Sequence, residues 1–318
     1  MACEQVTLQD VCELIVDCPH TSAKDEGVGY PLIRTPNVGR GRLILTDVHR
    51  VSQDVYERRV SRAVPRQGDL ILAREAPAGN VAIVSPGIEV CLGQRTMLLR
   101  PDSSFVVPEY LNYYLNAPEQ RDRMLRLANG ATVSHINVAD IRNMPVQLPS
   151  RGEQSKVAEL LNVLDDKIDL NNRLNDYLEQ CLLARYDHLF RGAGTYNGTI
   201  SDIGDVVGGA TPSKKRPEYY CHEGIGWITP KDLSNTTNKF VAHGADDITR
   251  VGFDSCSIKK LPAGTVLFSS RAPIGYIAIA SDEVTTNQGF KSIVPHKEIG
   301  TAFVYCFLVR NKDRIADA

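Results

Sequence analysis

Residues 153–190 read EQSKVAELLNVLDDKIDLNNRLNDYLEQCLLARYDHLF and contain neither proline nor glycine. Apolar residues recur in this stretch three or four positions apart, which is typical of one apolar stripe along a helix. The stripe consists of Val157, Leu160, Leu161, Leu164, Ile168, Leu174, Leu178, Leu182 and Leu189. Ser150 with Glu153 fits a capping box, and Gly192 stands where a helix would end. The stretch therefore predicts one helix about 57 Å long, well above the usual length of about 11 to 12 residues.

The segments on the two sides of this stretch repeat one another. Five short motifs occur in the same order in both, including a Thr-Pro pair and the pattern Ala-Pro-x-Gly-x-x-Ala-Ile. The matches are 7–14 with 199–206, 33–38 with 227–232, 68–83 with 264–279, Gln94 with Gln288, and 109–115 with 302–308. Ordered matches at a nearly constant offset indicate an internal duplication whose two copies are separated by the long helix.

Each copy is predicted to be rich in β-structure. Residues 68–74, 79–85 and 96–101 are short apolar runs bounded by turn residues, which favours strands, and 109–117 favours a short helix. The Ala-Pro-x-Gly motif is interpreted as a tight turn. We expect an α+β fold with two similar β-rich domains, 1–150 and 193–318, separated by a coiled-coil-type helix over 151–192.

The second copy ends at Ala318, near the position that corresponds to Arg123 in the first copy. Its closing segment and a second long helix are therefore expected to be missing from these 318 residues. The sequence leaves open whether the natural chain also lacks them.

The composition is that of a globular protein, with 42% hydrophobic and 23% charged residues. The longest apolar run, Phe303–Val309, is far too short to span a membrane. Glu4, Asp10 and Glu13 argue against a secretory signal at the start. The eight cysteines form no CxxC pair and no Cys/His ligand spacing. We expect a cytoplasmic protein that binds neither a metal nor a membrane.

Three sets of residues carry a resemblance to a known family: the stretch 131–168, the stretch 208–220 and the paired Ala-Pro-x-Gly motifs. Across essentially the whole chain, the sequence resembles the specificity subunit of type I restriction-modification systems. The resemblance implies two target-recognition domains, each reading one half of a split, asymmetric DNA target. It also implies that the long helix sets the spacing between the half-sites and docks methyltransferase subunits. Given about 34 to 36 Å per turn of duplex, half-sites one to two turns apart are expected.

The resemblance also implies the partners. They are double-stranded DNA, two type I methyltransferase (modification) subunits and, in complexes that also cleave DNA, a restriction/translocase subunit. S-adenosylmethionine would be bound by the methyltransferase partner, and no cofactor is expected on this chain. Members of the family have a second long helix antiparallel to the first, and the present sequence departs from them in lacking it.

Sequence-directed DNA binding requires donors for phosphates and forked or amide side chains for base edges. Residues 34–66 contain eight arginines against three acidic residues, in a chain whose net charge is −2. In the first copy the predicted DNA-binding residues are His20, Thr21, Ser22, Lys24, Arg34, Asn37, Arg40, Arg42, Arg74, Gln94 and Arg95. In the second copy they are Thr211, Ser213, Lys214, Lys215, Arg216, Lys231, Ser270, Arg271 and Gln288. The alternatives are a solvated charged surface and, for Gln94 and Gln288, a shared structural role in satisfying backbone groups.

The apolar stripe of the long helix is predicted to bind partner subunits, because an uncovered stripe is an exposed apolar patch. The predicted partner-binding residues are Val157, Leu161, Leu164, Ile168, Leu174, Leu178 and Leu182. If nothing covers them, the isolated chain is expected to self-associate.

No catalytic motif is recognisable in the chain. The Asn/Asp-Pro-Pro-aromatic motif of DNA methyltransferases is absent, as are GxxxxGK[ST], GxSxG and HExxH. The chain is therefore predicted to be a non-catalytic reader of DNA, with no catalytic residues. Two other hypotheses stay open: a modification enzyme whose catalytic part has been cut away, and a shortened interaction protein that binds methyltransferase and reads one half-site only.

Overall fold

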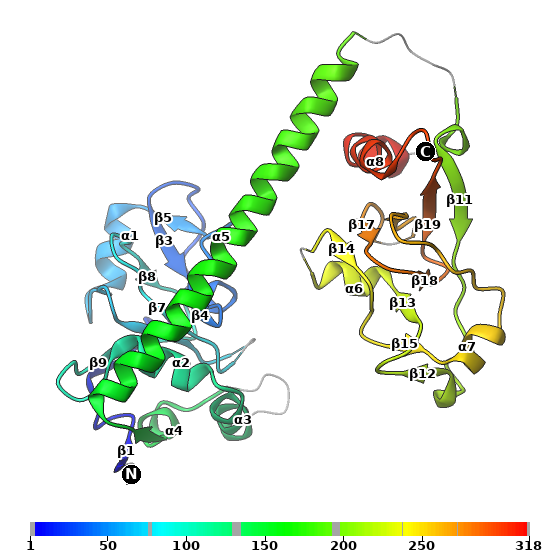
Figure 1. The fold of residues 1–318 in the computed structure, drawn as a ribbon. Coiled ribbons are helices and arrows are strands. Elements are labelled where there is room, and N and C mark those ends of the chain that lie inside the picture. Colours follow the sequence, from blue (N-terminus) through cyan, green and yellow to red (C-terminus); the bar gives the residue numbers. More distant parts are fainter. Residues whose placement is uncertain are drawn as a thin grey trace. The chain divides into compact units, whose positions relative to one another are not determined.

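The computed structural model describes residues 4–75, 78–128, 135–192, 198–236, 238–271 and 273–316 (Figure 1). The chain divides into two compact units, Met1–Asn172 (unit 1) and Arg173–Ala318 (unit 2). The described helices include none with the length and apolar composition that a membrane span requires.

The predicted long helix is confirmed as α5, Arg151–Phe190, which has 40 residues and a length of about 60 Å. At its start the carboxylate of Glu153 accepts hydrogen bonds from the backbone N–H and the hydroxyl of Ser150. It ends before Gly192, whose φ of 76° suits a residue without a side chain. Because the units divide after Asn172, each half of α5 belongs to one unit.

Unit 1 is built on a five-stranded sheet of order β2-β9-β6-β7-β4. Its strands are β2 (Cys12–Asp17), β4 (Gly41–Arg42), β6 (Leu70–Ala73), β7 (Val81–Ile83) and β9 (Thr96–Pro101). The pairs are antiparallel except for β4 with β7, which is parallel. The predicted strands at 68–74, 79–85 and 96–101 are thus confirmed.

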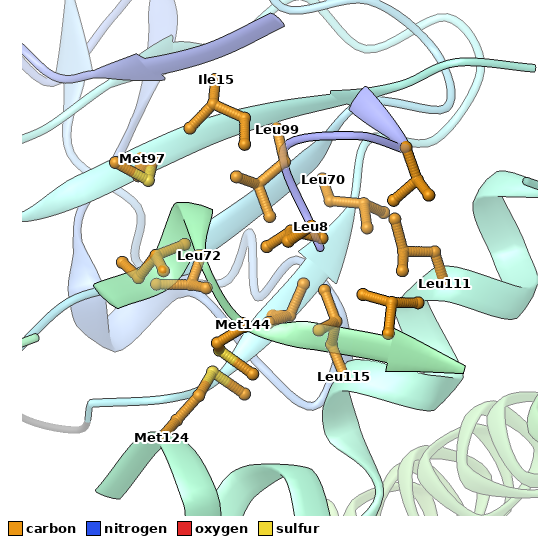
Figure 2. Close-up of a cluster of buried hydrophobic side chains, with 14 of the residues drawn as sticks. Leu8, Ile15, Leu70, Leu72, Met97, Leu99, Leu111, Leu115, Met124 and Met144 are labelled. Carbon is orange, nitrogen blue, oxygen red and sulfur yellow. The ribbon is translucent and has the colours of Figure 1, made fainter. Parts of the chain in front are cut away.

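Both faces of this sheet are buried, which explains why β6 is uniformly apolar rather than alternating. Leu70 and Leu72 point into one core together with Leu8, Leu99 and Leu111 (Figure 2). On the other face Ile71 and Ala73 pack with Ala82 and Leu98 in a second core. The helices of this unit are α1 (Gln53–Arg59), α2 (Pro108–Asn116), α3 (Pro118–Leu127) and α4 (Val138–Arg142).

Two further small sheets and one short 3-10 helix complete unit 1. Strands β5 (Arg50–Val51), β3 (Tyr30–Ile33) and β8 (Cys91–Leu92) form one sheet, and η1 (Thr35–Asn37) follows β3. Strand β1 (Glu4–Thr7) pairs antiparallel with β10 (Pro145–Leu148). This pairing ties the start of the chain to the segment that leads into α5, and the sequence pattern did not predict it.

Unit 2 repeats the central sheet in the order β11-β19-β16-β17-β14. The strands are β11 (Gly204–Gly208), β14 (Phe240–Val241), β16 (Val266–Phe268), β17 (Ile277–Ala280) and β19 (Lys291–Pro295). The last pair, β14 with β17, is again parallel. The parallel pair β13 (Gly226–Ile228) and β18 (Val284–Thr286) repeats β3 with β8, and α8 (Thr301–Ala316) occupies the place of α2 in chain order. Equal strand order and equal strand direction confirm the duplication and the α+β fold class.

The remaining elements of unit 2 are β12 (Tyr220–Cys221), β15 (Asp247–Ile248), η2 (Ile200–Asp202), η3 (Pro217–Tyr219), α6 (Pro230–Ser234) and α7 (Arg250–Asp254). In the two Ala-Pro-x-Gly motifs, Gly79 and Gly275 have φ values of 80° and 92°, as the predicted tight turns require. Ala76, Pro77 and Ala272 of these motifs lie outside the described residues.

Each unit holds its half of α5 through a basic residue and a tyrosine. In unit 1, Arg42 pairs with Asp166 at 2.6 Å and with Asp169, and the Tyr113 hydroxyl donates to Asp165 at 2.8 Å. In unit 2, Lys239 pairs with Glu179 at 2.9 Å and the Tyr305 hydroxyl donates to the same carboxylate. Arg310 adds an ion pair with Asp187. The acidic residues of α5 therefore anchor the two repeated folds to the helix.

Candidate nucleic-acid interface

Three loops of unit 1 meet at one edge of the central sheet. The strand register places Asp17 opposite Met97 and Ala73 opposite Thr96, so the loops that follow β2 and β6 and the loop that precedes β9 lie together. They enclose a hollow of about 310 Å³. It is lined by His20, Arg74, Glu75, Gln94 and Arg95. Four of these five residues belong to the predicted DNA-binding set.

Unit 2 has a larger cleft, of about 820 Å³, at the corresponding edge of its sheet. Gly208 stands opposite Lys291 there, and Ser269 forms a bridge with Phe290. The predicted residues that line the cleft are Thr211, Lys214, Lys231, Arg271 and Gln288. Nine of the twenty predicted residues thus line the two hollows, four in unit 1 and five in unit 2, and they come from equivalent loops.

Each of the two repeated glutamines contacts the loop that follows the edge strand of its central sheet, β2 in unit 1 and β11 in unit 2. Nε2 of Gln94 donates to the His20 carbonyl at 3.1 Å, and Oε1 of Gln288 accepts from the Thr211 hydroxyl. Both side chains are exposed. The bond from Gln94 to the His20 carbonyl fits a structural role in which the glutamine satisfies a backbone group. Because both side chains are exposed, the other polar atom of each amide stays accessible.

The hollow of unit 1 contains a network of opposite charges. Arg74 pairs with Asp17 at 2.7 Å and donates through Nε to the Ile136 carbonyl at 2.9 Å. His20 lies 3.4 Å from the same aspartate. Arg95 pairs with Glu75 at 2.8 Å. Arg74 is nearly buried, whereas 57% of the Arg95 side chain is exposed, so Arg95 is the guanidinium that a ligand can reach.

The cleft of unit 2 has aromatic walls. Trp227 donates through Nε1 to the Ala210 carbonyl at 3.2 Å, and the ring of Tyr220 lies edge-on to it at 5.5 Å. Burial raises the pKa of the Tyr220 phenol, which therefore stays neutral and donates to the Pro212 carbonyl at 2.6 Å. Asp232 accepts from the backbone N–H and the hydroxyl of Thr229, and this fixes the start of α6 beside the cleft. The lining contains three cationic side chains, Lys214, Lys231 and Arg271, against Asp232 and Asp246, and this positive excess suits an anionic polymer.

Four predicted DNA-binding residues have other roles in the fold. Asn37 is buried, accepting from the Arg34 backbone N–H and donating to the Ile44 carbonyl. The hydrophobic part of Arg34 covers Gly93, with Cγ 2.8 Å from where a Cβ there would be. Arg42 holds α5, as described above, and the hydroxyl of Ser270 donates to the Gly289 carbonyl at 3.3 Å. These contacts give the four residues structural roles, and DNA binding by them stays a prediction.

The other predicted residues are at the surface but line neither hollow. They are Thr21, Ser22, Lys24, Arg40, Ser213, Lys215 and Arg216. Arg216 pairs with Glu218 at 3.3 Å, and the Thr21 carbonyl accepts from buried Arg59. Among the described residues, these contacts do not mark the seven residues as part of a site, and their DNA binding stays a prediction.

Several residues of the two hollows were not predicted from the sequence. Glu75 stands between Arg74 and the Ala-Pro-x-Gly motif, and its alignment with Arg271 of the second copy would have marked it. Trp227 of the unit 2 cleft stands two residues before the repeated Thr-Pro pair, and Pro230 is the proline of that pair. Arg59 belonged to a charged run that indicated only a basic surface.

The apolar stripe of α5 is open to solvent. Six of its predicted partner-binding residues have exposures of 40–56%, and Leu161 is half-buried. The six are Val157, Leu164, Ile168, Leu174, Leu178 and Leu182. A row of large aliphatic side chains this exposed is a surface suited to a partner helix.

Comparison with known proteins gives consistent matches to one family. A family model described as "Type I restriction modification DNA specificity domain" matches residues 2–180 and again 195–317. The MjaIX specificity subunit of a type I restriction enzyme from Methanocaldococcus jannaschii is 46% identical over 113 residues, which cover 36% of this chain and 26% of that relative. The HindI specificity subunit from Haemophilus influenzae is 22% identical over 322 residues, covering 76% of this chain and 70% of that protein.

One solved structure shares the fold. The S subunit of a type I restriction-modification system from M. genitalium superimposes with a TM-score of 0.56 at 15% sequence identity. The superposition covers all of this chain and 79% of that subunit.

Proposed function

The chain belongs to the type I restriction modification DNA specificity family, and on that premise we propose that it is the DNA-recognition subunit of a type I restriction-modification complex. Each unit reads one half of a split target through the hollow at the edge of its central sheet. The subunit itself is non-catalytic and works in the cytoplasm.

The observation that carries this proposal is the repetition of one recognition fold with different polar side chains. The two central sheets have the same strand order, and their equivalent loops enclose hollows that contain Gln94 in unit 1 and Gln288 in unit 2. The residues around these glutamines differ between the units. A common scaffold with different donors and acceptors is what an asymmetric two-part target requires.

A complete central sheet and an open cleft in unit 2 also support two half-sites over one. A subunit that reads two half-sites is therefore favoured over an interaction protein that reads only one. A catalytic fragment is disfavoured as well, because the family model covers both units as DNA specificity domains.

Partner subunits would dock on the apolar stripe of α5. We infer two methyltransferase subunits, which bind S-adenosylmethionine and carry out adenine methylation. A restriction/translocase subunit joins them in complexes that also cleave DNA. Exposed Leu164, Ile168 and Leu178 support this role of the helix. The helix would also set the distance between the half-sites.

Co-purification with the methyltransferase encoded beside this chain tests the proposal, followed by sequencing of the methylated adenines in DNA exposed to the complex. We expect a stable complex and one two-part methylation motif. A complex that forms but modifies adenines without any sequence motif would refute DNA recognition. Failure of the methyltransferase to co-purify would refute the proposed role of α5.

A further inference from the structure

The two hollows differ in a coordinated way at two positions. The repeat aligns Glu75 with Arg271, in the loop after β6 or β16, and Arg95 with Gly289, in the loop before β9 or β19. Unit 1 therefore has a carboxylate on the first loop and a guanidinium on the second. Unit 2 has a guanidinium at the first position and a glycine at the second. Each hollow thus receives one accessible guanidinium, but from opposite loops.

In unit 1 the guanidinium is aimed by its surroundings. Arg95 has a φ of 66°, a left-handed conformation that an L-residue with a long side chain rarely adopts. Its ion pair with Glu75 at 2.8 Å holds the side chain over the hollow, and Glu75 itself is only 18% exposed. A strained backbone and a dedicated carboxylate are understandable if the direction of the guanidinium matters.

In unit 2 a side chain at position 289 of the second loop would be crowded. A Cβ on Gly289 would lie 2.9 Å from Oδ1 of Asn287 and 3.0 Å from Cγ of Pro230. Arg271 supplies the guanidinium instead; it lines the cleft and is exposed, and within the described ranges it has no ion-pair partner. Its donors are therefore free for a ligand.

We propose that Arg95 and Arg271 are the specificity-determining residues of the two units, each donating two hydrogen bonds to one guanine of its own half-site. This assignment rests on the proposed function. The planar guanidinium fork matches O6 and N7 of guanine in the major groove, which the single ammonium of lysine does not. Lys214 and Lys231, also on the unit 2 cleft, are suited to phosphates, where direction matters less.

The test compares the 318-residue chain with its Arg271→Lys, Arg271→Ala and Arg95→Lys variants, each used to enrich binding sites from a randomised duplex library. Arg271→Lys keeps the positive charge but not the fork. It should lower the preference for guanine at one position of one half-site by about fivefold or more and leave the other half-site unchanged. Arg95→Lys should do the same in the opposite half-site. Lys297→Ala, an exposed lysine after the far end of β19, is the control and should leave both half-sites intact.

Two results would overturn the assignment alone. In the first, Arg271→Lys enriches the same motif as the wild type, while Arg271→Ala weakens binding to all sequences equally and lowers the salt dependence of DNA affinity. A residue that contacts phosphate behaves in this way. The other is a loss of preference at a base pair other than G·C. A wild-type chain that enriches no motif would instead refute the proposed function, and the assignment would fail with it.

Discussion

Arg59 illustrates how a charged residue in a basic run serves the fold. Only 5% of it is exposed, and its guanidinium donates to the Leu92 carbonyl at 2.9 Å and to the Thr21 carbonyl at 2.6 Å. It thereby joins the loop that follows β2 to β8. The run of arginines in residues 34–66 predicted a basic surface but could not separate this structural member from exposed ones, because burial depends on the packing of α1 against β8.

Arg59→Ala should lower the free energy of unfolding by about 2–3 kcal/mol, because it leaves two carbonyl groups without their charged donor. Chemical denaturation of the purified chain measures this loss. Arg58→Ala is the matched control, since Arg58 is the preceding residue of α1 and is exposed; its effect should stay within about 0.5 kcal/mol. Equal effects of the two substitutions would contradict the role of Arg59.

The Glu179 carboxylate gives unit 2 a dependence on pH. Burial favours a higher pKa, but the hydrogen bond from Tyr305 and the ion pair with Lys239 outweigh it, so the pKa of Glu179 lies below its ordinary value. A lowered folded-state pKa contributes stability above the unfolded-state value of about 4.3, and this contribution is lost as the pH falls through the folded-state value. Acid should therefore loosen the attachment of unit 2 to its half of α5.

We expect the wild-type chain to lose more stability between pH 6 and pH 3 than Glu179→Gln does, as measured by denaturant midpoints at each pH. Asp176→Asn, at an exposed position one turn earlier on α5, should behave like the wild type. An identical pH dependence in Glu179→Gln and the wild type would show that the carboxylate does not anchor unit 2.

Helices and strands with a strong hydrophobic period could be predicted from the sequence, whereas pairings between distant segments could not. The sequence predicted α5 and the strands β6, β7 and β9, because long amphipathic and buried apolar runs carry a clear signal. It did not predict β1 with β10, or the two-residue strands, since so short a strand has no period. The contact of Arg42 with Asp166 and Asp169 spans more than 120 residues of sequence, so no local pattern could predict that this arginine holds the helix.

The candidate sites followed the same rule. The repeat pointed to the loops around Gln94 and Gln288, which the structure places in the two hollows. The ion pair of Glu75 with Arg95 joins two loops that only the sheet register brings together. Local motifs could name the loops, and the fold was needed to select the residues within them.

The exposed stripe of α5 should control association. Leu164→Glu combined with Leu178→Glu should abolish co-purification with the methyltransferase and the self-association of the isolated chain, without a loss of stability, because both leucines are at least half exposed. Sedimentation velocity and affinity capture measure the two effects. Val251→Glu, at a position on α7 that is 62% exposed, is the control and should change neither. A double variant that still captures the methyltransferase would place the docking surface elsewhere.

At the scale of the whole molecule, the duplicated recognition fold is the basis of the account. One sheet order occurs twice, each time joined to one half of the same 40-residue helix by a basic residue and a tyrosine. In the proposed function, such a chain binds DNA by two units that are alike in scaffold and different in side chains. The target should therefore be asymmetric and interrupted by bases that neither unit reads.

Hydroxyl-radical footprinting of the chain, in complex with its methyltransferase, on the DNA that it methylates tests this claim most directly. We expect two protected segments of different sequence, one to two turns of duplex apart. Arg271→Lys should weaken the protection of one segment and leave the other intact. A single continuous footprint, or one segment protected and nothing else, would contradict the claim that each unit reads its own half-site.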